Sequence, residues 1–278
     1  MKNSRRIFES ALVAATATLL LGAACGRDPS AATKGAEKPA AAHEKHWGYE
    51  DGPDSAGPAR WGDLVGDGPC KLGKAQSPIA LVDSGEGAAA KEPALSFDYK
   101  PSKLSMINIG HTVQITYDRG SSVTEAGDSY PLAQFHFHAA SEHTLDGKSF
   151  PLEVHLVHVD SAGKPALVVG VFVREGAENA ALAAAFRALP GKKDESSEPA
   201  GATVDASGVL PASRTHFAYD GSLTTPPCTE GVRWRVMQEP IAMSAAQIEA
   251  FRSLPHLAHT NRSLQPLGAR SVLLIAAP

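Results

Sequence analysis

The stretch Gln134-Phe135-His136-Phe137-His138 indicates a β-strand with two chemically different faces. Side chains of successive residues in a strand point to opposite sides. Gln134, His136 and His138 therefore share one face, while both Phe rings point to the other face, where we expect a core. The two imidazoles on the shared face lie about 6 to 7 Å apart along such a strand.

The stretch from Leu152 to Asp160 repeats this pattern in a second predicted strand. Glu153 and His155 fall on one face, and Val154 and Leu156 fall on the opposite face. A third imidazole is thus accompanied by a carboxylate on its own side of the strand.

Three imidazoles on two such strands suggest a catalytic zinc site. Three neutral histidines leave a fourth position open, whereas structural zinc sites usually close with four ligands rich in Cys. Zinc-bound histidines normally donate their second ring N–H to a carboxylate or carbonyl, and Gln134 and Glu153 are spaced to orient His136 and His155. Spacing alone is a weak signal, because packing or surface histidines give the same pattern.

The remaining segments indicate a protein that is mostly β. Several are short, rich in Val, Ile, Phe and Tyr, and bounded by Gly, Pro or Asp, as strands are; in addition to 133–138 and 152–160, they are 105–117, 166–174, 232–237 and 271–276. Helical patterning is limited to 180–189 and 244–254, and the second begins with Ser244 as a cap and a Gln three residues on. The chain has no internal repeat, so we expect one folded domain.

Composition excludes one class of partner. The 278-residue chain is 43% hydrophobic and 20% charged, which is ordinary for a folded soluble protein. Its formal net charge of -4 provides no basic field that could neutralise phosphates, so we expect no nucleic-acid partner.

Residues 1–24 have the pattern of a secretory signal peptide, with basic residues before an apolar run from 11 to 21. The run is too short to span a bilayer, which argues against a transmembrane anchor. Cys25 stands where bacterial lipoproteins are cleaved and acylated, although Gly22 replaces the Leu that is usual there. Cleavage after Ala24 without lipidation is the alternative.

Residues 25–46 are predicted to be a disordered tether, because they are rich in Ala, Lys, Glu and Pro and contain no aromatic residue. Such a tether would hold the domain that follows, 47–278, away from a membrane surface if Cys25 carries a lipid. We therefore expect export to the periplasm of a bacterium, either free or anchored at the outer membrane.

Cys70 and Cys228 are the two cysteines that are left when Cys25 is set aside. Export favours a disulfide between them. Closing a loop of about 160 residues stabilises the fold by at most about 5 kcal/mol in the chain-entropy model. Two free buried thiols are the alternative.

The residues around the histidines resemble those of the alpha-class carbonic anhydrases. In order along the chain, the resemblance is carried by His46-Trp47-Gly48-Tyr49, Gln76-Ser77-Pro78-Ile79, Gln134 to His138, Ser141-Glu142-His143-Thr144, Glu153 to His158, Gly221-Ser222-Leu223-Thr224-Thr225-Pro226-Pro227, Trp234, Asn261-Arg262 and Gln265-Pro266-Leu267. An ordered set that covers essentially the whole predicted domain is far more specific than any single motif. Cys70 and Cys228 also fall where bacterial members form their disulfide.

The resemblance implies a fold and a reaction. The fold is a single domain with a large central, mainly antiparallel twisted sheet and a few peripheral helices, and the zinc lies at the bottom of a cleft. His136, His138 and His155 are the implied zinc ligands. The implied reaction is reversible hydration of carbon dioxide, in which zinc hydroxide attacks the substrate and gives bicarbonate.

Further roles come from the same resemblance. Thr224 would donate its hydroxyl hydrogen to ionised Glu142 and so orient the hydroxide, His111 would shuttle the released proton, and Tyr49 would join the water network. The implied substrate pocket consists of Val157, Val168, Leu223, Thr225, Val232 and Trp234.

We expect no catalytic role for the other histidines. His158 lies an odd step from His155, so we expect it on the opposite face and buried, and His143 is expected to support Glu142 or the fold. His43 and His46 belong to the end of the tether, whereas no partner pattern is found for His216, His256 and His259.

Two alternative functions use the same fold. One is a zinc-dependent esterase, because the same nucleophile can attack another electrophile. The other is a non-catalytic binding module, since fold alone does not fix function. The expected partners are carbon dioxide and bicarbonate, and the chain is expected to be a monomer or a homodimer.

Overall fold

A computed structural model describes residues 46–64, 68–83 and 94–277, all within one compact unit that spans 43–278. The predicted signal peptide and Cys25 lie outside the described residues. So does the predicted tether, except for His46, which is the first residue of strand β1 (His46–Trp47). None of the helices in the described ranges is both long and apolar enough to cross a membrane.

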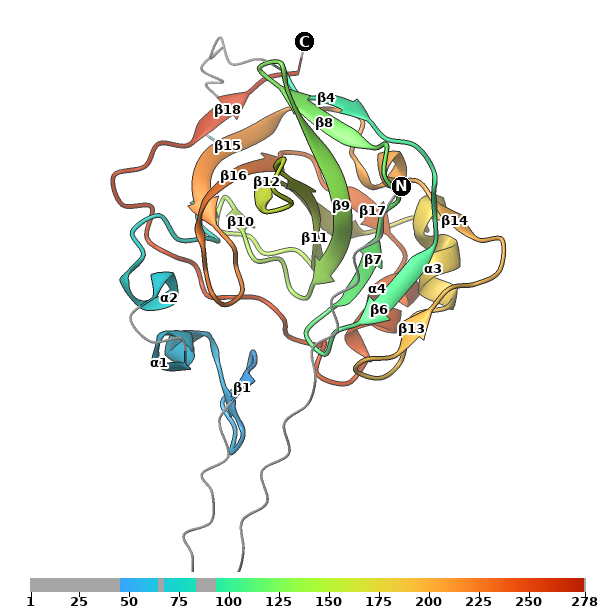
Figure 1. The fold of residues 1–278 in the computed structure, drawn as a ribbon, viewed down its shortest axis with the longest axis horizontal. Helices are drawn as coiled ribbons and strands as arrows, with labels where there is room; N and C mark the ends of the chain where they lie inside the picture. The colour runs from blue at the N-terminus through green and yellow to red at the C-terminus, as the bar shows by residue number, and fades with distance from the viewer. Residues whose placement is uncertain (1–45, 65–67, 84–93, 278) are drawn as a thin grey trace, which may run out of the picture. The chain divides into compact units, whose positions relative to one another are not determined.

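A large twisted sheet organises the described residues (Figure 1). In order across it, the strands are β13 (Ser196–Ser197), β6 (Ser105–Asn108), β7 (Val113–Thr116), β9 (Asp128–His138), β11 (Leu152–Val159), β12 (Pro165–Glu175), β16 (Glu230–Met237), β15 (His216–Ser222) and β18 (Leu273–Ile275). Three more strands extend it, namely β17 (Ile241–Met243) beside β12, β8 (Ser122–Glu125) beside β9, and β4 (Ser96–Asp98) beside β8.

Most neighbouring strands of this sheet are antiparallel, which confirms the predicted fold class. The exception is β12, which pairs in parallel with β16 and with β17. Three small two-stranded sheets lie outside it, formed by β1 with β2 (Ser55–Ala56), β3 (Ala80–Leu81) with β10 (Thr144–Leu145), and β5 (Ser102–Lys103) with β14 (Thr203–Val204).

The helices of the described residues are few and short. They are α1 (Trp61–Leu64), α2 (Pro69–Leu72), α3 (Ala183–Arg187) and α4 (Ala245–Arg252), with 3₁₀ turns at Pro58–Arg60, Ala180–Leu182 and Ala206–Val209. The predicted cap of α4 is present, because Ser244 and Gln247 form a reciprocal capping box that satisfies backbone N–H groups at the start of the helix.

The two faces of β11 pack against different apolar clusters. Val154 and Leu156 belong to the larger cluster, together with Phe135 and Phe137 of β9. Val157 belongs to the smaller cluster, which contains Trp234. The alternation predicted from the sequence therefore separates a structural core from a second apolar region beside the histidines.

One predicted strand is divided into two. The segment 105–117 forms β6 and β7, which are joined by a turn in which Gly110 has φ of 84°. Few residues other than Gly adopt this conformation. The amide of Gly110 donates to Oδ1 of Asn108 at 2.9 Å, and the amide of Ile109 donates to the carbonyl of Thr112 at 3.0 Å. This turn carries His111.

Cys70 in α2 forms the predicted disulfide with Cys228. The bond joins residues 158 positions apart in the sequence. It attaches α2 to the loop between β15 and β16, which contains Thr224 and Thr225.

Candidate metal centre

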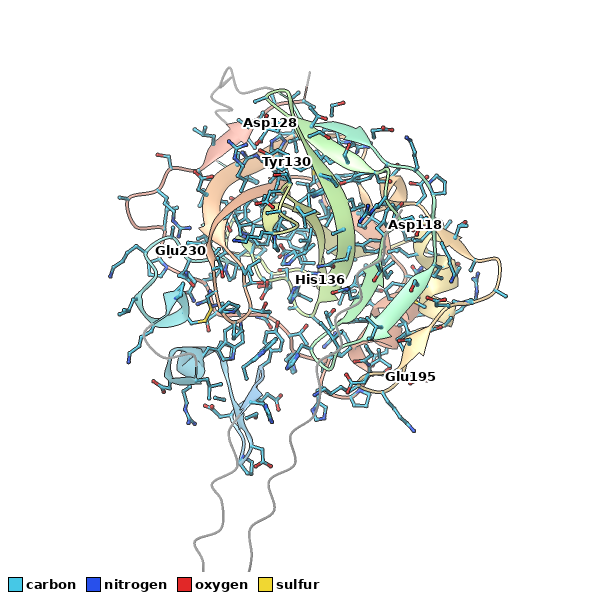
Figure 2. All side chains as sticks on the ribbon, viewed as in Figure 1. Asp118, Asp128, Tyr130, His136, Glu195 and Glu230 are labelled. Atoms are coloured by element: carbon cyan, nitrogen blue, oxygen red, sulfur yellow. A yellow bond between two sulfur atoms is a disulfide. The ribbon has the colours of Figure 1, made fainter. Side chains whose placement is uncertain are left out.

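The pairing of β9 with β11 brings the three predicted ligand histidines together. His155 lies directly opposite His136, and His138 lies opposite Glu153. The ring centroid of His138 is 5.0 Å from that of His136 and 4.5 Å from that of His155. One ring nitrogen from each of the three lies within 4.8 Å of the others. Figure 2 shows His136 on β9, near the middle of the drawn ribbon.

Each of these rings uses one nitrogen in a hydrogen bond within the protein. Nδ1 of His136 contacts Oε1 of Gln134 at 2.9 Å, and Nδ1 of His138 contacts the carbonyl of Thr260 at 2.6 Å. Nε2 of His155 contacts Oε1 of Glu153 at 2.9 Å. A neutral imidazole carries one N–H, and a hydrogen-bond acceptor beside one nitrogen places that hydrogen there. Nε2 of His136, Nε2 of His138 and Nδ1 of His155 are therefore left as lone-pair donors.

The free nitrogens suit a zinc ion. Nε2 of His138 is buried and has no hydrogen-bond partner, which is costly unless a ligand occupies that side of the ring. Three imidazoles with an open fourth position are the donor set of catalytic zinc sites. A carboxylate or carbonyl on the second nitrogen of a ligand ring is the usual outer arrangement.

The surroundings keep the rings neutral, as metal ligation requires. Burial lowers the pKa of His138 to about 4, although the hydrogen bond to Thr260 opposes this shift. Burial also lowers the pKa of His155, and it lowers that of His136 well below its usual value, with the neighbouring imidazoles adding to both shifts.

Glu153 is fully buried and organises the protein around His155. Its Oε1 accepts hydrogen bonds from the rings of His143, at 2.7 Å, and His155, at 2.9 Å. Its Oε2 accepts from the backbone N–H groups of Glu142 and His143, both at 2.9 Å. Burial raises the pKa of Glu153, but the charges and hydrogen bonds of His143 and His155 outweigh it and hold the pKa well below the usual range. The group is therefore an ionised acceptor.

A second cluster of possible ligands, His143, Glu153 and His155, overlaps the first. Its donor atoms are already in use. Both ring nitrogens of His143 are hydrogen-bonded, to Glu153 at 2.7 Å and to the hydroxyl of Tyr219 at 2.6 Å. Both oxygens of Glu153 also have partners. A metal here would have to break these bonds, so the cluster of His136, His138 and His155 fits an ion better.

Glu142 and Thr224 lie next to the histidines. Oε2 of Glu142 is 3.9 Å from Nδ1 of His155, and its Oε1 accepts from the backbone N–H of Arg262 at 2.8 Å. Burial raises the pKa of Glu142 to about 7, whereas His155, the hydroxyl of Thr224 and the Arg262 amide lower it. Oε2 is buried and has no hydrogen-bond partner among the described residues.

The predicted substrate pocket corresponds largely to one apolar cluster. Val157, Val168, Val232 and Trp234 are buried in it, and Leu223 packs against them. The ring centroid of Trp234 is 4.8 Å from that of His155, which places this apolar wall beside the metal centre. Thr225 is half-buried in the neighbouring loop and is not part of the cluster.

His111 and Tyr49 line a cavity of about 520 Å³ next to the metal centre. The ring of His111 stacks on Trp47 at 3.7 Å between centroids, and its Nε2 contacts the carbonyl of Trp47 at 3.1 Å. Tyr49 links the cavity to the ligands, since its ring centroid is 6.5 Å from those of His111 and His138. The three ligand histidines themselves do not line the cavity.

Some contacts in this region were not found from the sequence. The carbonyl of Thr260 and the backbone N–H of Arg262 hold His138 and Glu142 from more than a hundred residues away. Almost every residue has these backbone groups, so the sequence does not indicate which of them form such contacts. His256 and His259, for which no role was found, line the same cavity as His111.

These features define a mostly β protein with a cluster of three histidines, two buried and one half-buried, that matches the donor set of catalytic zinc sites. Comparison with known proteins agrees, because residues 56–275 match the model of the eukaryotic-type carbonic anhydrase family. The chain is 39% identical to a carbonic anhydrase from Pectobacterium carotovorum, over a match that covers 82% of this chain and 90% of the relative. It is 40% identical to a carbonic anhydrase from Neisseria gonorrhoeae, over a match that covers 84% of this chain and 90% of the relative. The alpha-carbonic anhydrase of Thermovibrio ammonificans, solved with the inhibitor sulfanilamide, is 41% identical, with a TM-score of 0.75 over 82% of this chain and 98% of that one. The chain belongs to the eukaryotic-type carbonic anhydrase family.

Proposed function

We propose that this chain catalyses the zinc-dependent, reversible hydration of carbon dioxide to bicarbonate and a proton. The observation that carries the proposal is the set of three imidazoles, two buried and one half-buried, each of which offers one ring nitrogen within 4.8 Å of the others. Their hydrogen bonds leave Nε2 of His136, Nε2 of His138 and Nδ1 of His155 available to an ion. No fourth His, Cys, Asp or Glu of the described residues joins that group.

His136, His138 and His155 would hold the zinc through those nitrogens. A zinc ion bound by neutral imidazoles makes a water at its open position lose a proton far more readily than bulk water does, and carbonic anhydrases are themselves the standard example of this effect. Gln134, Thr260 and Glu153 fix the hydrogen of each ligand ring on the side away from the centre.

Thr224 and Glu142 would orient the reacting water. Glu142, when ionised, accepts the hydroxyl hydrogen of Thr224, so the Thr224 oxygen is left to accept a hydrogen from that water. Orientation of this kind lowers the barrier because a freely rotating nucleophile loses the advantage of proximity. A dication close to Glu142 would favour its ionised form, against the effect of burial.

Carbon dioxide is apolar, and the wall formed by Val157, Val168, Leu223, Val232 and Trp234 offers an apolar surface beside the metal centre. Thr225 adds a polar group at the edge of this wall, where it could contact bicarbonate. A site that joins an apolar wall to a polar centre suits a reaction that turns an apolar gas into an anion.

His111 would carry the released proton. The net reaction consumes one carbon dioxide and one water and gives one bicarbonate and one proton, and that proton must reach buffer before the next turnover. Imidazole is the side chain whose ordinary pKa lies near neutrality. Burial lowers the pKa of His111, and the positive charge of Lys193 lowers it further, while the hydrogen bond to Trp47 opposes both. The buried hydroxyl of Tyr49, which has no protein partner, can hold water in the same path.

We also propose export to the periplasm of a bacterium, as a free protein or as a lipoprotein acylated at Cys25. The Cys70–Cys228 disulfide supports this location, because such bonds persist in oxidising compartments and are rare in the cytosol. Mass spectrometry of the mature protein distinguishes an acylated Cys25 from cleavage without a lipid.

Stopped-flow hydration of carbon dioxide by metal-analysed protein tests the proposed function. We expect one zinc per chain and hydration that is lost when a chelator removes the zinc and regained when zinc returns. Cleavage of an activated ester, measured on the same sample, separates the primary activity from a side activity. A zinc-replete sample that cleaves esters but leaves carbon dioxide unhydrated would contradict the proposal.

A further inference from the structure

Two histidines outside the proposed machinery line the cavity that contains His111. They are His256 and His259, and both are exposed to solvent. The cavity, at about 520 Å³, has room for many water molecules, since one occupies roughly 30 Å³ in the liquid. The three imidazoles therefore border the same space for water.

The segment that carries these two histidines is fixed to the protein at buried points. Leu257 is fully buried, and its amide donates to the carbonyl of Leu254 at 3.1 Å. Thr260 is also fully buried, and its carbonyl accepts from the ligand ring of His138. His256 and His259 alternate with these anchors, so the backbone holds both at the cavity.

The position of His111 restricts how it can pass on a proton. Its Nε2 faces the carbonyl of Trp47, which accepts a hydrogen bond but does not carry a proton away. Nδ1 is thus the nitrogen that takes up a proton, and a backbone hydrogen bond between the ring and Ile109 favours the protonated form by raising the pKa of His111. While the Trp47 contact persists, the proton also leaves from Nδ1. Another acceptor must then collect it.

The other titratable groups that line the cavity do not suit this task. Burial, reinforced by the charge of Glu142, raises the pKa of Tyr49 well above its usual value, so it stays protonated at neutral pH. Asp51 is engaged by the amide of Gly57 at 3.0 Å and by Arg60 at 3.4 Å.

We propose that His256 and His259 collect protons from the water of this cavity and pass them to buffer. Each neutral imidazole takes one proton from cavity water at one nitrogen and releases one proton to a buffer base, so charge and atoms balance and no other reactant is needed. The proposal rests on the proposed function, because it concerns the proton that carbon dioxide hydration releases.

The test replaces both histidines without disturbing the backbone. His256 has φ of 65°, a conformation that Asn tolerates better than most residues, so the variant is His256→Asn combined with His259→Gln. The matched control is His46→Gln, which removes an exposed histidine that does not line the cavity. Near-ultraviolet circular dichroism checks that each variant is folded, and the two single variants are measured as well.

Two rates are compared on zinc-replete protein at low buffer concentration. Isotopic oxygen exchange gives the interconversion of carbon dioxide and bicarbonate separately from the release of the proton. We expect the double variant to keep its interconversion rate and to lose at least three-fold in proton release, with high concentrations of imidazole buffer restoring the loss. Proton release equal to that of the unmodified protein, or lowered only as much as in His46→Gln, overturns the proposal. Absence of interconversion in the unmodified protein would overturn the proposed function, and this inference with it.

A second measurement does not depend on activity. Nuclear magnetic resonance titration follows the ring protons of His256 and His259 in the unmodified protein. A group that collects protons and releases them to buffer must change its protonation state in the pH range in which hydration is measured, so we expect the signals of both rings to move with pH across that range. Signals of both rings that stay fixed across that range overturn the proposal.

Discussion

The ring of His155 donates from Nε2 to Oε1 of Glu153 at 2.9 Å, and this single contact leaves Nδ1 of His155 available to the proposed zinc ion. The other two candidate ligands are held at Nδ1 and present Nε2. The same carboxylate fixes the backbone amides of Glu142 and His143. One buried acid thus couples the orientation of a proposed metal ligand to the position of Glu142.

Replacing Glu153 by Gln should weaken zinc binding. Gln keeps the size of Glu but replaces one carboxylate oxygen by an NH₂ group, which cannot accept a hydrogen bond. The protein therefore loses either the hydrogen bonds from the rings of His143 and His155 or those from the backbone amides. Changes to such outer partners typically reduce metal affinity about 10- to 100-fold. Competition with a chromogenic chelator measures the affinity. The control is Glu198→Gln, which alters a glutamate whose partners are Lys103 and Ser105; equal affinities in all three proteins would contradict the role of Glu153.

Thr224→Val should lower turnover without removing zinc. Valine has nearly the shape of threonine but no hydroxyl, so the water is no longer oriented by a Thr224–Glu142 pair. Loss of precise orientation costs about 100-fold in rate. Stopped-flow hydration and metal analysis on the same sample measure both quantities. The control is Thr229→Val, on the same loop but exposed; hydration by Thr224→Val at the rate of this control would remove Thr224 from the mechanism.

Removing the disulfide should lower the free energy of unfolding. The Cys70–Cys228 bond restricts the unfolded chain over 158 residues, and loss of a native disulfide costs about 2 to 5 kcal/mol. Urea unfolding of the oxidised protein and of the double variant Cys70→Ala, Cys228→Ala measures the difference. Reductant should destabilise the unmodified protein and leave the double variant unaffected. If reductant shifted both proteins equally, the stabilisation would have another source.

The buried His158 should contribute to acid sensitivity. Its Nε2 contacts the hydroxyl of Tyr99 at 2.8 Å, and burial lowers its pKa from 6.5 to about 3. Between these values the unfolded chain binds a proton and the native protein does not. The stabilising contribution is therefore complete above pH 6.5 and is lost as the pH falls toward 3.

The size of this effect follows from the shift. Between pH 7 and pH 4.5 the unmodified protein should lose about 2 to 3 kcal/mol more than His158→Gln, since each pKa unit corresponds to about 1.4 kcal/mol. Urea unfolding at both pH values gives the comparison, and the exposed His46→Gln serves as the control. Identical losses in the unmodified protein and in His158→Gln would show that His158 does not titrate in this way.

Much of the fold could be predicted because side-chain alternation along a strand is a local property. The faces of β9 and β11 follow directly from residues 134–138 and 152–160, and the opposite placement of His155 and His158 follows as well. β15 was missed, because its last residues, Asp220, Gly221 and Ser222, read as a turn. The parallel pairing of β12 with β16 has no local signal either.

The site was predictable only in part, for a related reason. Alternation places the imidazoles on strand faces, but the register that sets His155 opposite His136 is a tertiary property. The contact between His138 and the carbonyl of Thr260 spans 122 residues and involves a backbone atom that every residue has. His256 and His259 reach the cavity through the same segment, so no nearby pattern could identify them.

A crystal structure of the zinc-loaded protein, with anomalous scattering measured at the zinc absorption edge, tests the central claim most directly. The expected result is one zinc ion bound by Nε2 of His136, Nε2 of His138 and Nδ1 of His155, with solvent at the remaining position. Zinc bound instead between His143, Glu153 and His155, or a fourth protein side chain on the ion, would contradict this account.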